Sequence, residues 1–435
     1  MNKKKYVNRN YLTTTRIIAL GFLITVIVGT ILLSLPIASA NGTWTDLLTA
    51  AFTSTTSVCV TGLVVVDTFS YWSLFGKGVI LILIQIGGLG IVSIITLFML
   101  LFRMKITLKS TMLLQDAFNL NSKQGLLKFT IKVIKGTFLI EGIGAFIYSF
   151  YYCREYGLLK GIWFSVFHAV SAFCNAGLDI MGADSLIPYH SNLLMMLNTS
   201  FLIIMGGIGF IVWWDTVEAF RRIRTKKCSI RSAWNGVHLQ TKIAIFMTLL
   251  LLIGGTVVIY FLERSNPDTL GNLSEKDRIL NAFFQSVTLR TAGFAAVPQA
   301  ALRPVTAFFG ALLMMIGGSP VGTAGGMKTV TIAVIFFTFA AMIRNHEDTE
   351  VFKRNIPVSV VKKAVAIVFL SMSTIFIMTI LLMATNDVNL LDALFEVASA
   401  VCTVGLSRNL TPVLNTAGQI IICLLYTSPS PRDAH

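Results

Sequence analysis

Long apolar segments, separated by short polar ones, run along almost the whole chain. Seven of them reach the roughly 20 residues that a helix needs to cross a bilayer, and an eighth begins at Asn415. The seven cover residues 16–37, 76–102, 133–153, 192–214, 242–262, 306–343 and 364–384. The first follows the basic sequence MNKKKYVNRN but is long for the apolar part of a signal peptide, so we interpret it as a retained helix. The pattern predicts an all-α membrane protein.

Four short segments lie between the members of successive helix pairs and align without gaps. They are AAFTSTTSVCVTGL from Ala50, SVFHAVSAFCNAGL from Ser165, NAFFQSVTLRTAGF from Asn281 and ALFEVASAVCTVGL from Ala393. In each, a phenylalanine stands ten residues before a glycine, and the four glycines are 115, 116 and 112 residues apart. Repetition at a near-constant period indicates copies of one structural unit. We predict four helix–pore-loop–helix repeats in a pseudo-fourfold arrangement around one ion pore, with the last helix truncated.

Each short segment is too short to span the membrane but can enter it as a half helix that ends in a glycine-containing turn. Helix C-termini carry partial negative charge, and irregular backbone at membrane depth must border protein or a water-filled cavity. Four such ends around one axis would form a cation filter in which carbonyl oxygens replace the hydration shell. The expected carbonyls belong to Val60, Thr61, Gly62, Asn175, Ala176, Gly177, Thr291, Ala292, Gly293, Thr403, Val404 and Gly405.

Close helix packing is the alternative role for these glycines, because small residues let backbones approach one another. The fourfold alignment favours the filter for the four loop glycines. For GGLG from Gly87 and GGIG from Gly206, packing of the second helices against the pore helices is the better interpretation.

These features carry a family resemblance. The four repeats, TLRTAGF in the third loop, GGLGI and GGIGF in the second helices, and GGSPVGTAGGMKT in the third repeat resemble the Trk/Ktr/HKT superfamily of potassium transporters. The short N-terminus is most similar to the bacterial Ktr-type membrane subunit, and the resemblance covers residues 11–422. It implies transport of K⁺, with Na⁺ as a further candidate in the role of activator. It also implies a homodimer and a cytosolic ring of nucleotide-binding regulatory subunits that docks on basic cytoplasmic loops.

The sixth apolar segment is interrupted by GGSPVGTAGGMKT, residues 317–329. A helix broken at this depth leaves backbone groups unpaired, so the loop must border water or be buried by protein. It starts 24 residues after Gly293, which places it below the filter, and the resemblance implies an intramembrane gate there. A purely structural kink is the alternative. We expect Lys328 to repel cations while the loop is closed. The expected gate residues are Gly317, Gly318, Ser319, Pro320, Gly322, Thr323, Gly325, Gly326 and Lys328.

Composition and charge agree with a membrane protein and suggest its orientation. Of the residues, 55% are hydrophobic and 13% charged, and the mean hydropathy is +0.76. Of the 35 Lys and Arg residues, 23 lie at the N-terminus up to Arg16 or in residues 103–132, 221–242 and 344–363. The positive-inside rule therefore places the N-terminus and these three loops in the cytoplasm. Nucleic-acid binding is disfavoured, because the net charge of +15 is spread over short loops rather than a basic domain. We expect a multi-pass protein of the bacterial cytoplasmic membrane.

A few polar side chains within the apolar segments need separate interpretation. Cys59, Cys174 and Cys402 share one alignment column, where packing behind the filter is favoured over metal binding, and no disulfide is predicted. Arg290 stands in that column in the third repeat, and we expect it to pair with Glu396 or Asp392 because an unpaired charge is costly there. His168 is expected to be a buried structural residue.

The end of the chain departs from the resemblance. From Cys423, the sequence CLLYTSPSPRDAH resembles the translation of a sequencing-library adapter, so we interpret it as an addition that replaces the rest of the fourth repeat. The expected division is therefore 1–103, first repeat; 104–225, second repeat with a cytoplasmic linker; 226–343, third repeat with a broken second helix; 344–422, incomplete fourth repeat; and 423–435, the added tail.

The expected function is K⁺ uptake down the membrane potential, through one filter per chain and past the gate in the third repeat. The alternative is a Na⁺-coupled or Na⁺-selective symporter with discontinuous helices. Coupling would need carboxylates in the spans, where Glu141 is the one candidate and is equally interpretable as a packed group. An enzyme is not expected, because the sequence has no HExxH, Walker phosphate loop or GxSxG motif.

Overall fold

The computed structural model describes residues 14–90, 93, 126–226, 229–346, 348–352 and 354–427. The end of the apolar segment 76–102, the basic residues before Thr14 and most of the loop 103–132 lie outside these residues. The described residues are mainly helical, with one two-stranded antiparallel sheet of β1 (Glu350–Val351) and β2 (Arg354–Asn355).

The helices fall into four consecutive groups, each with a first helix, a buried half helix and a second helix. The first group contains α1 (Thr14–Ser34), α2 (Leu47–Val58), the short α3 (Thr68–Tyr71) and α4 (Leu74–Leu89). The second contains α7 (Leu126–Tyr156), α8 (Leu158–Cys174), α9 (Leu193–Gly207) and α10 (Phe210–Lys226). The third contains α11 (Ile230–Asn235), α12 (Leu239–Glu263), α13 (Glu275–Thr288), α14 (Pro304–Met315) and α15 (Thr329–Ile343). The fourth contains α16 (Val358–Thr385), α17 (Leu390–Val401) and α18 (Thr416–Thr427).

The four half helices α2, α8, α13 and α17 begin and end where the sequence provides caps and turns. Asp46, Ser274 and Asn389 accept hydrogen bonds from backbone amides of the first turn in α2, α13 and α17. Such caps satisfy amides that have no partner inside the helix. In α8, Gly157 stands at this position without a side-chain cap. All four half helices end just before their loop glycine, as the repeat pattern predicts.

Two second helices are broken, whereas the sequence predicts a break in only one. α14 and α15 are separated by the predicted loop 316–328, but α9 and α10 also meet at an angle of 97° across Ile208 and Gly209. Gly209 has φ +94°, a conformation that suits glycine. The prediction of one continuous span over 192–214 is therefore wrong. α4 likewise ends at Gly90, with φ +79°.

The expected boundary at Ile422 falls inside the last helix of the fourth group. α18 continues five residues past Ile422 to Thr427, and Leu425 is 5% exposed. The predicted boundary at Ile422 therefore does not coincide with the end of an element. Residues 428–435 lie outside the described part of the chain.

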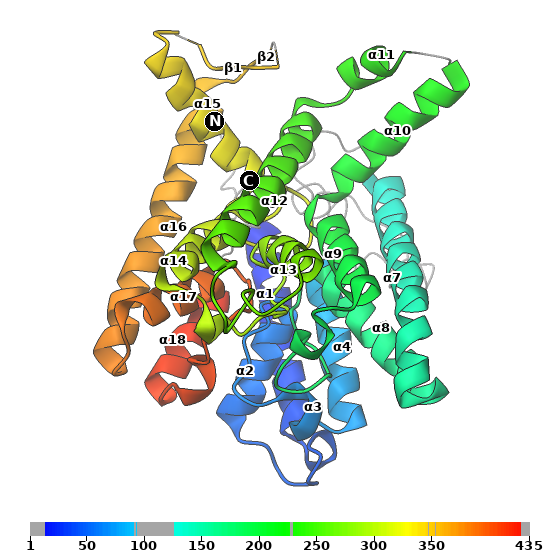
Figure 1. Ribbon diagram of the computed structural model, residues 1–435, viewed down its shortest axis with the longest axis vertical. Coiled ribbons are helices and arrows are strands. Elements are labelled where there is room, and N and C mark those ends of the chain that lie inside the picture. Colours follow the sequence, from blue (N-terminus) through cyan, green and yellow to red (C-terminus); the bar gives the residue numbers. More distant parts are fainter. Residues whose placement is uncertain are drawn as a thin grey trace, which may run out of the picture.

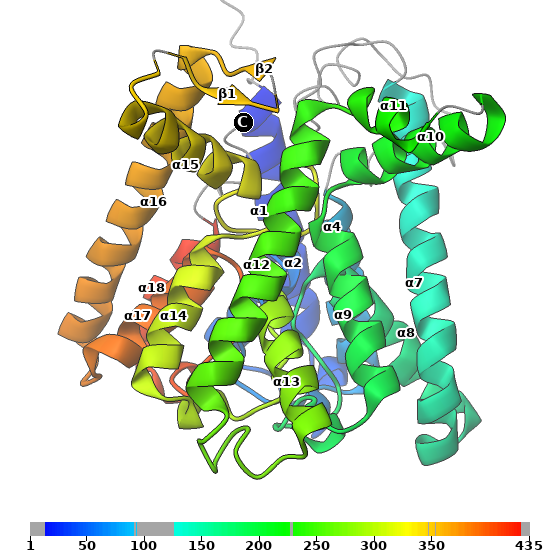
Figure 2. The same ribbon diagram turned by 45° about the horizontal axis from the view of Figure 1, so that its top comes forward.

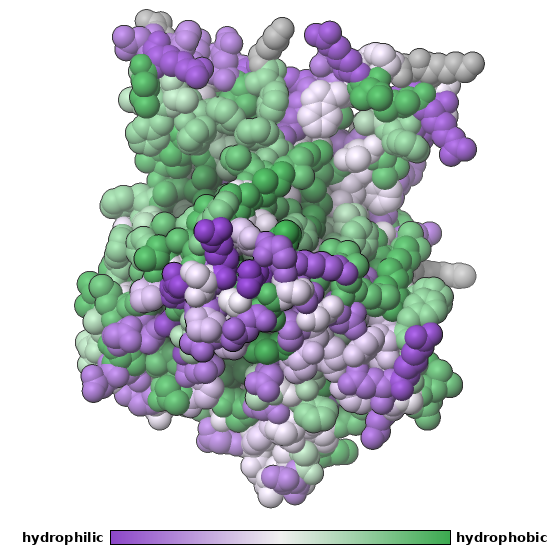
Figure 3. Space-filling view, in the orientation of Figure 1, coloured by the Kyte–Doolittle hydropathy of each residue, from purple (hydrophilic) through white to green (hydrophobic). Residues whose placement is uncertain are grey.

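The four groups surround a common centre (Figures 1 and 2). α7 lies at one side and α16 at the other, while α10, α11, α15 and the β1–β2 hairpin gather at the upper end. Three described helices are long and apolar enough to cross a membrane, or four with the bent α9–α10 pair. In Figure 3 hydrophobic side chains form a broad band below a hydrophilic upper edge, and a second hydrophilic group covers the lower front.

Most residues of the half helices are buried. Phe52, Phe167 and Phe395, which stand ten residues before their glycines, are fully buried. In the third repeat the fully buried ring is that of Phe284, and Phe283 at the aligned position is only partly buried. The gapless alignment is therefore offset by one residue inside the third half helix.

Candidate functional site

The predicted filter loops share one unusual backbone conformation. The residue two before each loop glycine has positive φ, as does the glycine itself. The values are 55° and 96° for Val60 and Gly62, 59° and 64° for Asn175 and Gly177, 68° and 84° for Thr291 and Gly293, and 52° and 92° for Thr403 and Gly405. Positive φ costs a non-glycine residue about 1–3 kcal/mol. The same strained turn, repeated four times, supports the alignment of the loops.

The four loops meet in a closed ring. A Cβ atom added to Gly62 would lie 2.5 Å from the carbonyl oxygen of Ala176 in the second repeat. The other three glycines repeat this contact with the middle residue of the next loop. Gly177 faces Ala292, Gly293 faces Val404, and Gly405 faces Thr61, which completes the circle. Twelve residues from four distant parts of the sequence are thus brought together, and only glycine fits where the loops touch.

Hydroxyl groups at the ends of the half helices fix these loops. Thr56 and Ser399 accept hydrogen bonds from the amides of Gly62 and Gly405, both at 3.0 Å. Ser171 donates to the carbonyl of Leu178, and Thr288 donates to that of Phe294.

The third loop differs from the others by one residue. In repeats one, two and four the amide of the middle filter residue bonds to a carbonyl five residues earlier, as Thr61 does to Thr56. In the third repeat Ala292 bonds to Thr288, only four residues earlier. The shift agrees with the burial of Phe284 instead of Phe283.

Polar side-chain atoms at the loops lack partners in the described part of the chain. These buried atoms are Thr61 Oγ1, Asn175 Nδ2, Thr291 Oγ1 and Thr403 Oγ1. Buried polar groups are normally hydrogen-bonded. Together with the helix C-termini that end nearby, they make the surroundings of the ring polar in an otherwise apolar core.

The predicted gate loop lies directly against two of the filter loops. Thr323 Oγ1 donates to the carbonyl of Phe173 at 3.0 Å and to Asn175 Oδ1 at 3.1 Å. A Cβ atom added to Gly325 would overlap Thr403 Oγ1 and lie 2.8 Å from the carbonyl oxygen of Cys402. The loop therefore contacts the end of the second half helix and the start of the fourth filter loop.

Bonds within the loop hold it in a compact form. Gly317 and Met327 pair through their backbones, with the Gly317 amide 2.9 Å from the Met327 carbonyl. Lys328 is 2% exposed, and its ammonium group donates to the carbonyl of Ala324 at 2.8 Å. Ser319 and Thr329 join their hydroxyls at 2.9 Å. Lys328 thus ties the loop to itself from a buried position.

The gate loop also interlocks with the unpredicted break between α9 and α10. The amides of Ser319 and Thr323 donate to the carbonyls of Gly207 and Gly206, at 2.8 and 3.1 Å. In return, the amide of Phe210 donates to the carbonyl of Val321 at 2.9 Å. Backbone groups that lack a partner within one broken helix are thereby hydrogen-bonded by the other.

The motifs GGLG and GGIG pack against the half helices as predicted, and GGIG also contains the bend between α9 and α10. Cβ atoms added to Gly87, Gly88 and Gly206 would overlap atoms of neighbouring half helices or their ends. The second helices therefore approach the half helices closely. Gly209, the last glycine of GGIG, ends the helical geometry as well.

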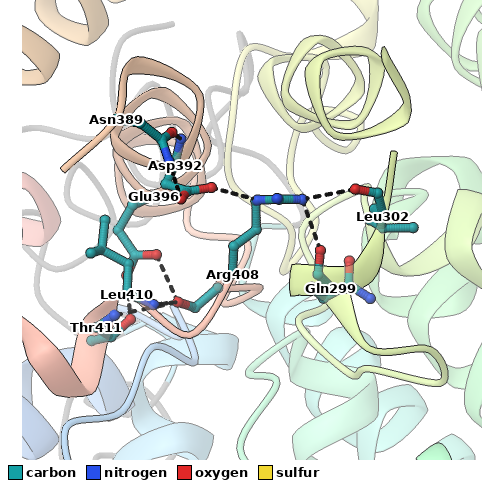
Figure 4. A network of polar contacts seen from close by, with 9 residues as sticks. Gln299, Leu302, Asn389, Asp392, Glu396, Arg408, Leu410 and Thr411 are labelled. Carbon is teal, nitrogen blue, oxygen red and sulfur yellow. Dashed lines mark hydrogen bonds and ion pairs between the residues drawn. The ribbon is translucent and has the colours of Figure 1, made fainter. Parts of the chain in front are cut away.

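The expected ion pair of Arg290 is wrong. Asp392 pairs with Arg408, with 2.6 Å between Oδ1 and Nε, and Glu396 accepts hydrogen bonds from Ser407 and Thr411 (Figure 4). Both carboxylates are used by the loop that follows the fourth filter. Arg290 lies 7% exposed and donates from Nη2 to the carbonyl of Gly317 at 3.4 Å. Sequence spacing could not reveal this, because Arg408, which pairs with Asp392, lies outside the aligned repeat segments.

The other polar side chains considered in the sequence analysis, Glu141 and His168, are packed in the core. Glu141 is 4% exposed and accepts hydrogen bonds from Gln85 at 3.2 and 3.3 Å, with Cys174 Sγ 3.8 Å away. His168 is buried, with Nδ1 3.0 Å from the carbonyl of Phe164. The five cysteines in the described residues form no disulfide with one another.

Comparison with known proteins identifies the family. A family model described as TrkH, cation transport protein, matches residues 3–427. The chain belongs to the TrkH family. Its resemblance to the Trk/Ktr transporters is thereby confirmed, and this is a family of transport proteins rather than enzymes.

Several relatives match this TrkH-family chain over nearly its whole length. It is 38% identical to the potassium/sodium uptake protein NtpJ of Enterococcus hirae, over 96% of this chain and 91% of that protein. It is 37% identical to the Ktr system potassium uptake protein B of Bacillus subtilis, over 98% and 92%. The protein of that name from Vibrio alginolyticus is 33% identical, over 94% and 87%.

A solved structure agrees on the fold. The crystal structure of the potassium transporter TrkH from Vibrio parahaemolyticus matches with a TM-score of 0.71 at 16% identity, over 97% of this chain and 84% of that one. The helical membrane fold of this TrkH-family protein, consistent with four repeats around a pore, is therefore shared despite low identity.

Proposed function

We propose that this TrkH-family protein takes up K⁺ across the bacterial cytoplasmic membrane, down the membrane potential. The observation that carries the proposal is the closed ring of four equivalent loops, each with a glycine against the carbonyl of the next. The relatives NtpJ and Ktr system protein B are named for potassium uptake, which supports the same ion.

In this proposal the carbonyls of the four loops replace the hydration shell of the ion. The twelve filter residues have side chains as different as those of Val60, Asn175 and Thr291, so the backbone is what the four quarters have in common. The C-terminal ends of four half helices add partial negative charge near the ring. Both features favour a dehydrated monovalent cation.

We propose that the loop 317–329 is the gate. It contacts the filter loops through a hydrogen bond of Thr323 and the close approach of Gly325. Lys328 contributes a positive charge within the gate. Displacement of the loop would open the path between the filter and the side of the membrane that carries α10 and α15.

Transport of Na⁺ is the second candidate function, because NtpJ is named a potassium/sodium uptake protein. Na⁺ could be a substrate, an activator or a coupling ion. Coupling through Glu141 has less support, since this carboxylate is bonded to Gln85 in the core.

The relatives named as parts of a Ktr system support a proposal about partners. We propose a homodimer whose cytoplasmic side docks a ring of nucleotide-binding regulatory subunits. The positive-inside rule assigns the N-terminus and the end with α10, α11 and α15 to the cytoplasm.

Ion flux into liposomes tests the transport proposal. The full chain is reconstituted, a K⁺ diffusion potential is imposed, and uptake of K⁺, Rb⁺, Na⁺ and NH₄⁺ is compared. We expect K⁺ and Rb⁺ to enter faster than Na⁺. Equal rates for K⁺ and Na⁺ would favour the second candidate, and no flux with or without a regulatory subunit would remove both.

A further inference from the structure

Arg290 occupies an unusual place for a charged side chain. It is 7% exposed and lies two residues after the end of α13. Among the described residues its side chain makes one hydrogen bond, from Nη2 to the carbonyl of Gly317. Its Nε has no hydrogen-bond partner, and no ion pair is formed with it, among the described residues. A buried charge in a membrane protein normally has a compensating partner.

The compensation comes from three helix ends. α13 ends at Thr288, α14 ends at Met315 just before the carbonyl that Arg290 binds, and α9 ends at Gly207. Arg290, Gly207 and Gly318 line one small cavity, together with Ile203, Ile204, Leu252 and Val287. A helix C-terminus carries about half a negative charge. Arg290 thus bonds to the chain just after α14, follows the end of α13 and shares a cavity with the end of α9.

The cavity lies at the contact between the two broken helices, where residues 206–210 meet residues 319–323; this contact is called the seam below. Gly207, beside the cavity, accepts the hydrogen bond of Ser319, and Gly206 accepts that of Thr323. Without a cation, the partial charges at the ends of α9 and α14 would repel each other across the seam. The other three repeats have Cys59, Cys174 and Cys402 at the aligned position, and none of their second helices carries the loop 317–329.

We propose that Arg290 is a positioning residue that holds the gate loop closed by binding the converging helix ends of the second and third repeats. The proposal rests on the proposed function of the loop 317–329 as a gate. Its role depends on charge, so lysine replaces it in part and glutamine does not. Loss of the charge loosens the seam and frees the loop from Gly206 and Gly207.

Hydrogen–deuterium exchange of the full chain in lipid nanodiscs tests the proposal without any transport measurement. The amides of Ser319 and Thr323 are protected by their bonds to Gly207 and Gly206. In Arg290→Gln we expect the peptide that covers residues 317–329 to exchange about tenfold faster. This change corresponds to the loss of about 1.4 kcal/mol of stabilisation from the helix ends. Arg290→Lys should exchange more slowly than Arg290→Gln, because lysine keeps the charge. Arg303→Gln, at an exposed arginine bonded to Ser265, is the control.

Three results would overturn the proposal. They are an unchanged exchange rate in Arg290→Gln, equally fast exchange in Arg290→Lys, and faster exchange throughout all four repeats, which would make Arg290 a general brace. K⁺ uptake by the same samples is measured separately. If the wild type transports no K⁺, the proposed function fails, whereas the exchange data still decide whether Arg290 fixes the loop.

Discussion

At the scale of single residues, the candidate filter depends on backbone geometry more than on side chains. Val60, Asn175, Thr291 and Thr403 differ in chemistry, yet all have positive φ. The glycine two residues later has no such freedom of identity, because any Cβ would meet the next loop. Selectivity should therefore respond most to changes at the glycines.

Replacing Gly177 with Ser tests this directly. The added side chain would meet the carbonyl of Ala292 at 2.8 Å, so we expect the ring to deform and the preference for K⁺ over Na⁺ to fall. Gly42→Ser is a matched control, since Gly42 also has positive φ (68°) but has no atom within 4 Å of an added Cβ. Gly405→Ser should act like Gly177→Ser. Unchanged selectivity in both filter variants would remove the filter assignment.

Arg408 has a structural role that can be separated from transport. Its side chain, 12% exposed, pairs with Asp392 and donates to the carbonyls of Gln299 and Leu302, which joins the third repeat to the fourth half helix. We expect Arg408→Gln to lower the free energy of unfolding by about 2 kcal/mol, because buried acceptors lose a charged donor. Thermal unfolding in detergent measures this, with the exposed Arg264→Gln as control. Equal melting temperatures for the two variants would contradict it.

At the scale of elements, the gate loop is a backbone structure held by its neighbours. Its bonds go to the half helix α8, to the broken end of α9 and to itself. Because hydrogen bonds to neighbouring backbone hold the proposed gate in place, small changes in sequence should shift the balance between closed and open forms.

Deleting residues Gly322 to Gly326 should raise K⁺ flux in the absence of any regulatory partner. The deletion removes Thr323, which bonds to Asn175, and Gly325, which packs on Thr403. Lys328→Gln should act in the same direction but less strongly, since it removes the bond to Ala324 and the charge. Liposome flux measures both, and correct insertion is checked by protease protection. Flux that falls or stays level would count against a gate.

At the scale of the whole molecule, the two breaks connect the end that carries α10, α11 and α15 with the ring of loops proposed as the filter. α10 continues from the seam to the end where α11 and α15 gather (Figure 2). On α10, Arg221 and Arg222 lie within 2.8 and 3.5 Å of Glu218 and are surface groups. Phe210, at the start of α10, bonds to Val321 of the loop 317–329, so α10 and this loop are in direct contact.

Neutralising Arg221, Arg222, Lys226 and Lys227 together should weaken association with a regulatory ring. In the wild type the association should strengthen at low ionic strength, because salt screens exposed charges. In the variant the association should not depend on salt in this way. Co-purification at several salt concentrations measures it. Arg154 and Lys160, neutralised as a pair on the opposite side, provide the control. If association is undiminished, contact with anionic lipids is the better explanation for the basic residues.

The sequence alone determined the fold class, the four repeats and the positions of the loop glycines. Apolar length, repeat period and the special geometry of glycine are local properties, and they can be seen without coordinates. The break at residues 317–329 was visible for the same reason, since glycine and proline interrupt a helix wherever it lies.

Only the tertiary structure decided how these parts meet. The bend at Gly209 depends on the gate loop, whose backbone pairs with the broken helix and makes the break tolerable. Asp392 forms an ion pair with Arg408 rather than with Arg290, because the loop after the fourth filter folds back onto the half helix that carries Asp392. The one-residue offset in the third repeat appears only in burial and hydrogen bonds. Each of these depends on competition between groups distant in sequence, and that competition is settled by packing in three dimensions.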